Sequence, residues 1–130
     1  MRFDYHVEPS PGDEFPPKPV VPVQFTNPLT GESSVVYCLL DTGADACHLP
    51  ASIIRDFGET DFEPWGIRVV GGAEIDTRAH VLNVNLCGKQ FAELDIVELP
   101  EGDDEPLLGR NVLNKFVVKL NGPDLVCEIQ

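Results

Sequence analysis

The stretch Leu39-Leu40-Asp41-Thr42-Gly43-Ala44-Asp45 is the most informative part of this chain of 130 residues. An apolar run leads directly into an aspartate, which a threonine and a glycine follow. Strands commonly end in Asp or Gly, so a plain turn is one interpretation. The other is chemical, because Thr42 can hydrogen-bond the backbone locally and Gly43 lets a second backbone come close. Asp41 is therefore a candidate catalytic carboxylate.

Two further segments carry information. In Pro106-Leu107-Leu108-Gly109-Arg110-Asn111-Val112-Leu113, an apolar pair stops at a glycine, and a short helix is expected over Asn111 to Phe116. Alone, this segment reads as an ordinary corner between a strand and a helix. Ile67 to Asp76 is strand-like on both sides of Gly71-Gly72, which is typical of a hairpin tip.

Short apolar runs and turn residues alternate along the rest of the chain, which predicts a small, closed all-β domain. Residues 1–19 are rich in proline and are expected to form an N-terminal extension, so the domain is placed at residues 20–130. In the extension, Phe3, Tyr5 and Val7 alternate with polar residues in a short strand pattern. The expected hairpins pair 20–26 with 34–40, 80–86 with 90–99, and 117–120 with 125–129, and residues 50–58 are expected to hold one or two helical turns.

Composition narrows the possible functions. The chain has 22 acidic and nine basic residues, a net charge of -13, which disfavours binding to nucleic acid. No apolar run is long enough to span a membrane, and the first residues show no signal peptide. The four cysteines are widely spaced and include no Cys-x-x-Cys pair, so a zinc knuckle is not expected. We interpret them as reduced, mostly buried thiols of a cytoplasmic protein; their even number leaves disulfides as the alternative. We expect no bound metal or other cofactor.

Taken together, the three segments resemble the retroviral-type (retropepsin-like) aspartic peptidases. In that family a strand ends in Asp-Thr-Gly-Ala, a Gly-rich flap hairpin follows, and an apolar pair later precedes Gly-Arg-Asn and a C-terminal helix. All three features stand here in this order, at Asp41 to Ala44, at Val69 to Gly72, and at Leu107 to Asn111. The resemblance covers about residues 20–116. It implies a small closed barrel with a flap hairpin and one short C-terminal helix.

The resemblance implies roles for individual residues. Asp41 would be the catalytic carboxylate, and Thr42, Gly43 and Ala44 would support the active-site loop. Arg110 would pair with Asp45 as a structural buttress beside Gly109. The substrate main chain would contact Gly43 and Asp45 from below and a closing flap from above. The flap tip would consist of Val70, Gly71 and Gly72.

Peptide hydrolysis of this kind needs an acid and a base on either side of one water, and two close carboxylates that share a proton supply both. Asp-Thr-Gly occurs once in the chain, and Asp45 is too near in sequence to be a symmetric partner. The partner would be Asp41 of a second copy, since a two-fold interface brings the same residue to both sides of its axis. We therefore expect a homodimeric aspartic endopeptidase that acts on polypeptides. The alternative is a catalytically silent dimerisation or peptide-binding module of the same fold.

Overall fold

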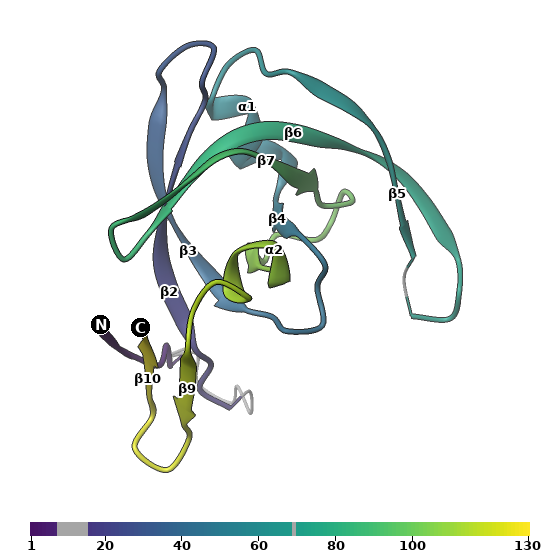
Figure 1. The fold of residues 1–130 in the computed structure, drawn as a ribbon. Helices are drawn as coiled ribbons and strands as arrows, with labels where there is room; N and C mark the ends of the chain where they lie inside the picture. Colours follow the sequence, from purple (N-terminus) through teal and green to yellow (C-terminus); the bar gives the residue numbers. More distant parts are fainter. Residues whose placement is uncertain (8–15, 69) are drawn as a thin grey trace.

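The fold is a closed β-barrel from which one hairpin projects (Figure 1). The structure, a computed structural model, describes residues 1–7, 16–68 and 70–130. The barrel strands are β2 (Val20–Thr26), β3 (Ser33–Leu40), β4 (Cys47–Leu49), β5 (Phe62–Arg68), β6 (Glu74–Leu86), β7 (Lys89–Glu98) and β8 (Leu107–Leu108). They form one sheet in the order β2-β3-β8-β4-β7-β6-β5, and a further pairing between β2 and β6 closes it. This confirms the expected fold class, a small, closed all-β barrel.

The hairpin of β2 and β3 supplies much of the core. Val21, Val23 and Phe25 alternate along β2 and are fully buried, as a strand with one inward face requires. The turn after β2 is anchored by Asn27, whose buried side-chain amide donates to the carbonyl oxygens of Phe57 at 3.0 Å and Glu59 at 2.7 Å. The predicted pairing of these two strands is confirmed, with β3 beginning at Ser33.

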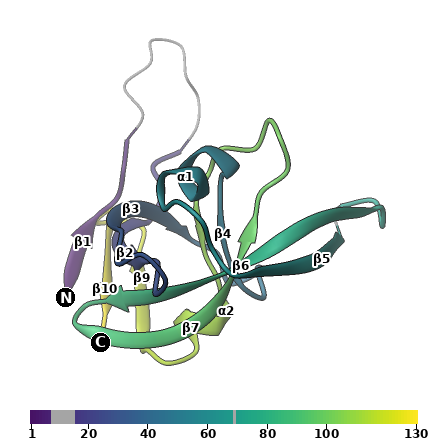
Figure 2. The ribbon, with the colours of Figure 1, turned by 90° about the horizontal axis from the view of Figure 1, so that it is seen from above.

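The long strand β6 belongs to both the barrel and the projecting hairpin. Its first half pairs with β5 and its second half pairs with β2, for example through Phe25 and Val84. We expected one strand to end at Asp76 and another to begin at His80, but β6 runs through without a break. The intervening residues include no turn former, so nothing stops the strand. Figure 2 shows how far β5 and β6 extend beyond the barrel.

The two chain termini meet in a second, three-stranded sheet, in the order β1 (Arg2–Asp4), β10 (Val126–Ile129), β9 (Val118–Asn121). Phe3 pairs with Cys127, and the amino group of Met1 donates to the carbonyl oxygen of Ile129 at 2.6 Å (Figure 1). The predicted C-terminal hairpin is therefore present, and the strand pattern at the N-terminus forms its third strand. Part of the proline-rich extension, residues 8–15, lies outside the described residues.

Two short helices complete the described structure, α1 (Ala51–Asp56) and α2 (Arg110–Leu113). The first lies within the predicted helical segment. The second begins one residue earlier than expected and does not reach Phe116, because a turn already starts at Asn114. No helix in the described part of the chain is long and apolar enough to cross a membrane.

Candidate active site

Asp41 lies where β3 leaves the barrel sheet. Strands β3 and β8 run parallel, with Leu40 beside Leu108, and the backbone N–H of Asp41 continues this pairing by donating to the carbonyl oxygen of Leu108 at 3.1 Å. The backbone N–H of Gly43 then donates to the Asp41 Oδ1 at 2.9 Å. This local turn orients the carboxylate, which is partly exposed and lines a pocket.

The loop of residues 41–46 passes around the end of β8, because β8 lies between β3 and β4 in the sheet. Gly109 follows β8 and packs against the backbone of Ala46 so closely that a Cβ at position 109 would overlap the Ala46 carbonyl. Two backbone hydrogen bonds join the loop to α2: Arg110 N–H donates to the Ala44 oxygen at 2.9 Å and Asn111 N–H to the Asp45 oxygen at 3.1 Å. Only glycine at position 109 permits this approach.

The side chain of Arg110 holds the same loop from outside. Its Nη2 pairs with the Asp45 carboxylate, and its Nη1 donates to the carbonyl oxygen of Thr42 at 2.7 Å. The pair that the resemblance implied is thus present. Both side chains are solvent-exposed, with 40% of the Arg110 and 90% of the Asp45 side-chain surface accessible. The ion pair between Arg110 and Asp45 therefore contributes little Coulomb energy, and its main effect is to hold the loop in position.

A buried thiol holds the loop from behind. The Cys47 Sγ accepts a hydrogen bond from the Gly109 N–H at 3.4 Å and donates to the Asn111 Oδ1 at 3.3 Å. The same Asn111 oxygen accepts from the Cys47 N–H at 3.1 Å. Burial raises the pKa of Cys47 to about 11, against the smaller opposing effect of the Gly109 N–H, so the thiol keeps the proton that it donates. The sequence did not predict that Cys47 and Asn111 support the active-site loop through these hydrogen bonds.

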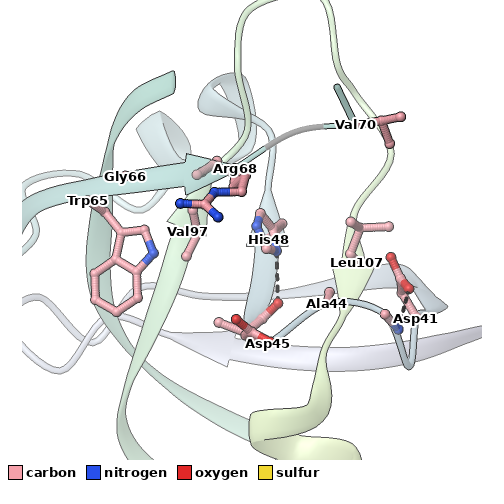
Figure 3. Close-up of a pocket in the computed structure, with 13 residues that line it drawn as sticks. Asp41, Ala44, Asp45, His48, Trp65, Gly66, Arg68, Val70, Val97 and Leu107 are labelled. Atoms are coloured by element: carbon pink, nitrogen blue, oxygen red, sulfur yellow. Dashed lines mark hydrogen bonds between the residues drawn. The ribbon is translucent and has the colours of Figure 1, made fainter. Parts of the chain in front are cut away.

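The pocket beside Asp41 has a volume of about 490 Å³ and lies between the active-site loop and the end of β5 (Figure 3). The loop and β4 form one side, β5 and Val70 form the other, and Val97 and Leu107 complete the lining. A cleft of this kind between a partly exposed carboxylate and a projecting hairpin can hold an extended peptide. Its lining residues are Asp41, Gly43, Ala44, Asp45, Ala46, His48, Trp65, Gly66, Ile67, Arg68, Val70, Val97 and Leu107.

His48 and Trp65, which the sequence did not mark as site residues, also line this pocket. The Nδ1 of His48 hydrogen-bonds to the carbonyl oxygen of Ala46 at 2.8 Å. Burial lowers the pKa of His48, although the Ala46 carbonyl and the charges of Asp41 and Asp45 act in the opposite direction. The sequence held one sign of this position. His48 stands between Cys47 and Leu49, which are both buried, and alternation along a strand then turns His48 away from the core.

The structure brings most of the predicted site residues together. Asp41, Gly43, Ala44, Asp45 and Val70 all line the pocket. Gly71 and Gly72 lie at the hairpin tip beyond it, with φ angles of 100° and 85°. Thr42 is exposed on the loop and does not line the pocket, and Arg110 and Gly109 support the loop, as described above. Val69 lies outside the described residues.

A known protein family matches the greater part of the chain. The family model described as gag-polyprotein putative aspartyl protease matches residues 30–115, about two thirds of the chain. The matched range includes the Asp41 loop, the β5–β6 hairpin and α2. No curated protein matches the chain significantly.

Proposed function

The chain belongs to the retropepsin-like aspartic peptidase family, and from this premise we propose that it is an aspartic endopeptidase. The observation that carries the proposal is the position of Asp41. Its carboxylate opens into a peptide-sized pocket, on a loop held by β8, by α2 and by the side chain of Arg110. Residues 20–130 form the peptidase domain in this proposal, and residues 1–19 form an extension.

The reaction needs a second carboxylate, which we assign to Asp41 of a partner copy. Two such groups close together share one proton, because both cannot ionise at once. The protonated group donates to the carbonyl oxygen of the substrate while the ionised one takes a proton from water, which attacks the carbonyl carbon. As the C–N bond of the intermediate breaks, the carboxyl group that took the proton of water gives it to the nitrogen of the leaving amine. The other carboxylate takes back the proton from the former carbonyl oxygen, which restores the C=O bond and the singly protonated pair.

Solvent-exposed side chains on the active-site loop and on the terminal sheet support the proposed homodimer. Thr42 is exposed at the loop, where it would meet its symmetry mate, and the terminal sheet leaves large apolar side chains in solvent. Burying such groups against a second copy would favour association. In Figure 1 the loop after β3 and the β9–β10 hairpin extend from the same, lower side of the barrel. The exposed apolar residues of the terminal sheet and its flanks are Met1, Val117, Leu120 and Leu125.

We assign the β5–β6 hairpin the role of a flap. Val70 lies at its tip and is fully exposed, and in Figure 3 it stands above Leu107 and Asp41. Closure over a peptide would cover Val70 and exclude water from the pocket. The positive φ angles of Gly71 and Gly72 suit a tight tip that only glycine forms without strain. The four free thiols, most of them buried, fit the proposed cytoplasmic location.

The test is digestion of a denatured protein mixture at mildly acidic pH, with sequencing of the products. Cleavage is expected with the wild-type chain and none with Asp41→Asn purified in the same way. Equal cleavage by both would refute the proposal. Peptide binding without cleavage would favour the alternative, a catalytically silent peptide-binding or dimerisation module.

A further inference from the structure

Apart from the carboxylates of Asp41 and Asp45, three polar side-chain groups on the pocket wall have no hydrogen-bond partner within the described residues: His48 Nε2, Trp65 Nε1 and the guanidinium of Arg68. Asp45, by contrast, is already paired with Arg110. The rest of the lining is mainly aliphatic or backbone. These three groups are therefore the ones available to recognise a polar side chain of a bound peptide.

The protonation of His48 follows from its contact with the loop. A carbonyl oxygen only accepts, so the 2.8 Å contact with Ala46 requires that Nδ1 carries the ring proton. The lowered pKa keeps the ring neutral at neutral pH, which leaves a lone pair on Nε2. Because Nδ1 is turned toward the loop, Nε2 lies on the opposite side of the ring, toward Arg68 (Figure 3).

The wall of one pocket thus carries an acceptor at His48 and donors on β5. Arg68 and the indole N–H of Trp65 can only donate. A primary amide suits this combination, since its NH₂ donates to Nε2 while its oxygen accepts from β5. An alkyl side chain would cover Nε2 and leave it unpaired. A carboxylate would gain Arg68 but would face the Nε2 lone pair and the negative charges of Asp41 and Asp45.

We propose that His48 makes this pocket selective for a glutamine or asparagine side chain of the substrate, over an aliphatic or acidic side chain of similar size. The inference rests on the proposed function, because it assumes that the pocket holds a polypeptide. It narrows the substrate class to polypeptides with a primary amide near the scissile bond.

The experiment uses decapeptides of apolar residues in which one position at a time carries Gln, Met or Glu. Hydrolysis of each set is measured near pH 7 for wild type, for His48→Val and for the control His6→Val, whose histidine is exposed and outside the pocket. Wild type and the control should prefer Gln over Met at one position by about tenfold, the value of one neutral hydrogen bond. His48→Val should lose this preference and cleave the Met peptide at least as well, which also shows that it folds.

Binding provides a readout without catalysis. Trp65 is the only tryptophan of the chain and lines the pocket, so its fluorescence reports occupancy by the same peptides in Asp41→Asn protein. The Gln peptide should bind about tenfold more tightly than the Met peptide, and His48→Val in this background should remove the difference.

The possible failures are distinct. Cleavage with no Gln preference, with a preference that His48→Val retains, or with a preference for Glu at pH 7 overturns the inference and leaves the proposed function intact. If no peptide is cleaved either at pH 7 or at mildly acidic pH, but the Gln peptide binds in a His48-dependent way, the inference holds and the peptidase proposal fails. If no peptide is cleaved at either pH and none is bound, both fail.

Discussion

Arg110 donates a hydrogen bond of 2.7 Å from its Nη1 to the carbonyl oxygen of Thr42. The other end of the same guanidinium pairs with Asp45, so one side chain of α2 holds the loop on both sides of its centre. Because Asp41 directly precedes Thr42, the position of the carboxylate depends on this contact. Replacing Arg110 should therefore disturb the position of the Asp41 carboxylate more than it changes the electrostatic energy of the folded chain.

Arg110→Ala should lower stability by only about 1 kcal/mol, since the ion pair is exposed and one hydrogen bond is lost. Peptidase activity should fall further than stability explains, because the loop loses its fixed position. Arg110→Lys should rescue activity only partly, since an ammonium lacks the two-pronged geometry. Urea denaturation and peptide hydrolysis measure the two effects. Arg55→Ala, at another exposed arginine, is the control, and equal activity in Arg110→Ala and Arg55→Ala would contradict the argument.

Asp41→Asn should reduce hydrolysis by about a thousandfold or more, because an amide can neither take nor give the proton of the dyad. The fold should be unchanged, since an amide oxygen can still accept from the Gly43 N–H. Circular dichroism and a peptide assay test the two statements. Asp56→Asn, a substitution of the same kind on the exposed end of α1, should leave activity intact.

Gly109→Ala should destabilise the chain by about 1–3 kcal/mol, because its methyl group would overlap the Ala46 carbonyl and force β8 and β4 apart. Activity should fall as well, since Asp41 is positioned by β8. The matched control is Gly122→Ala, where an added Cβ meets no atom within 4 Å. Denaturation midpoints of the two variants provide the test, and similar values would show that the close approach is unimportant.

An excess of Asp41→Asn chains should inactivate wild-type chains if each active site uses both copies. After co-refolding with the mutant at about ninefold excess, random pairing leaves about a tenth of wild-type chains with a wild-type partner. Activity per wild-type chain should drop to about that fraction. Sedimentation of the mutant alone checks that it still dimerises. Constant activity per wild-type chain would mean that one protomer is sufficient.

Acidification should destabilise the folded chain in part through His48. Burial lowers its pKa in the folded state, so between that value and the ordinary 6.5 the unfolded chain binds a proton that the folded chain does not. Above pH 6.5 neither state binds this proton, so His48 does not change the free energy of unfolding. As the pH drops below 6.5, the free energy of unfolding decreases until the pH is below the folded-state pKa. Replacing His48 by Gln should make the urea midpoint less sensitive to pH between about 7 and 5. His6→Gln, at equal protomer concentration, should behave like wild type in this comparison.

Several hairpins of the fold could be predicted from the sequence of neighbouring residues. The β2–β3 hairpin, the tight turn at Cys87 and Gly88, and the C-terminal hairpin all follow from alternating residues and turn formers. Strand β5 was only partly predicted, because Pro64 and Gly66 disfavour strands. Both are tolerated there because β5 is the last strand of its sheet and pairs on one side only.

What the sequence determined by itself is local chemistry: an apolar strand that ends in Asp-Thr-Gly, a glycine-rich hairpin tip, and the Gly109-Arg110 corner. Neighbouring residues alone specify such features. The tertiary structure decided which distant residues surround Asp41. Strand β8 has two residues and no pattern of its own, yet its parallel pairing with β3 positions the carboxylate. Likewise His48 and Trp65 meet at one pocket only because the barrel closes and the β5–β6 hairpin extends over the loop. Such contacts depend on long-range strand pairing, which short-range sequence patterns do not encode.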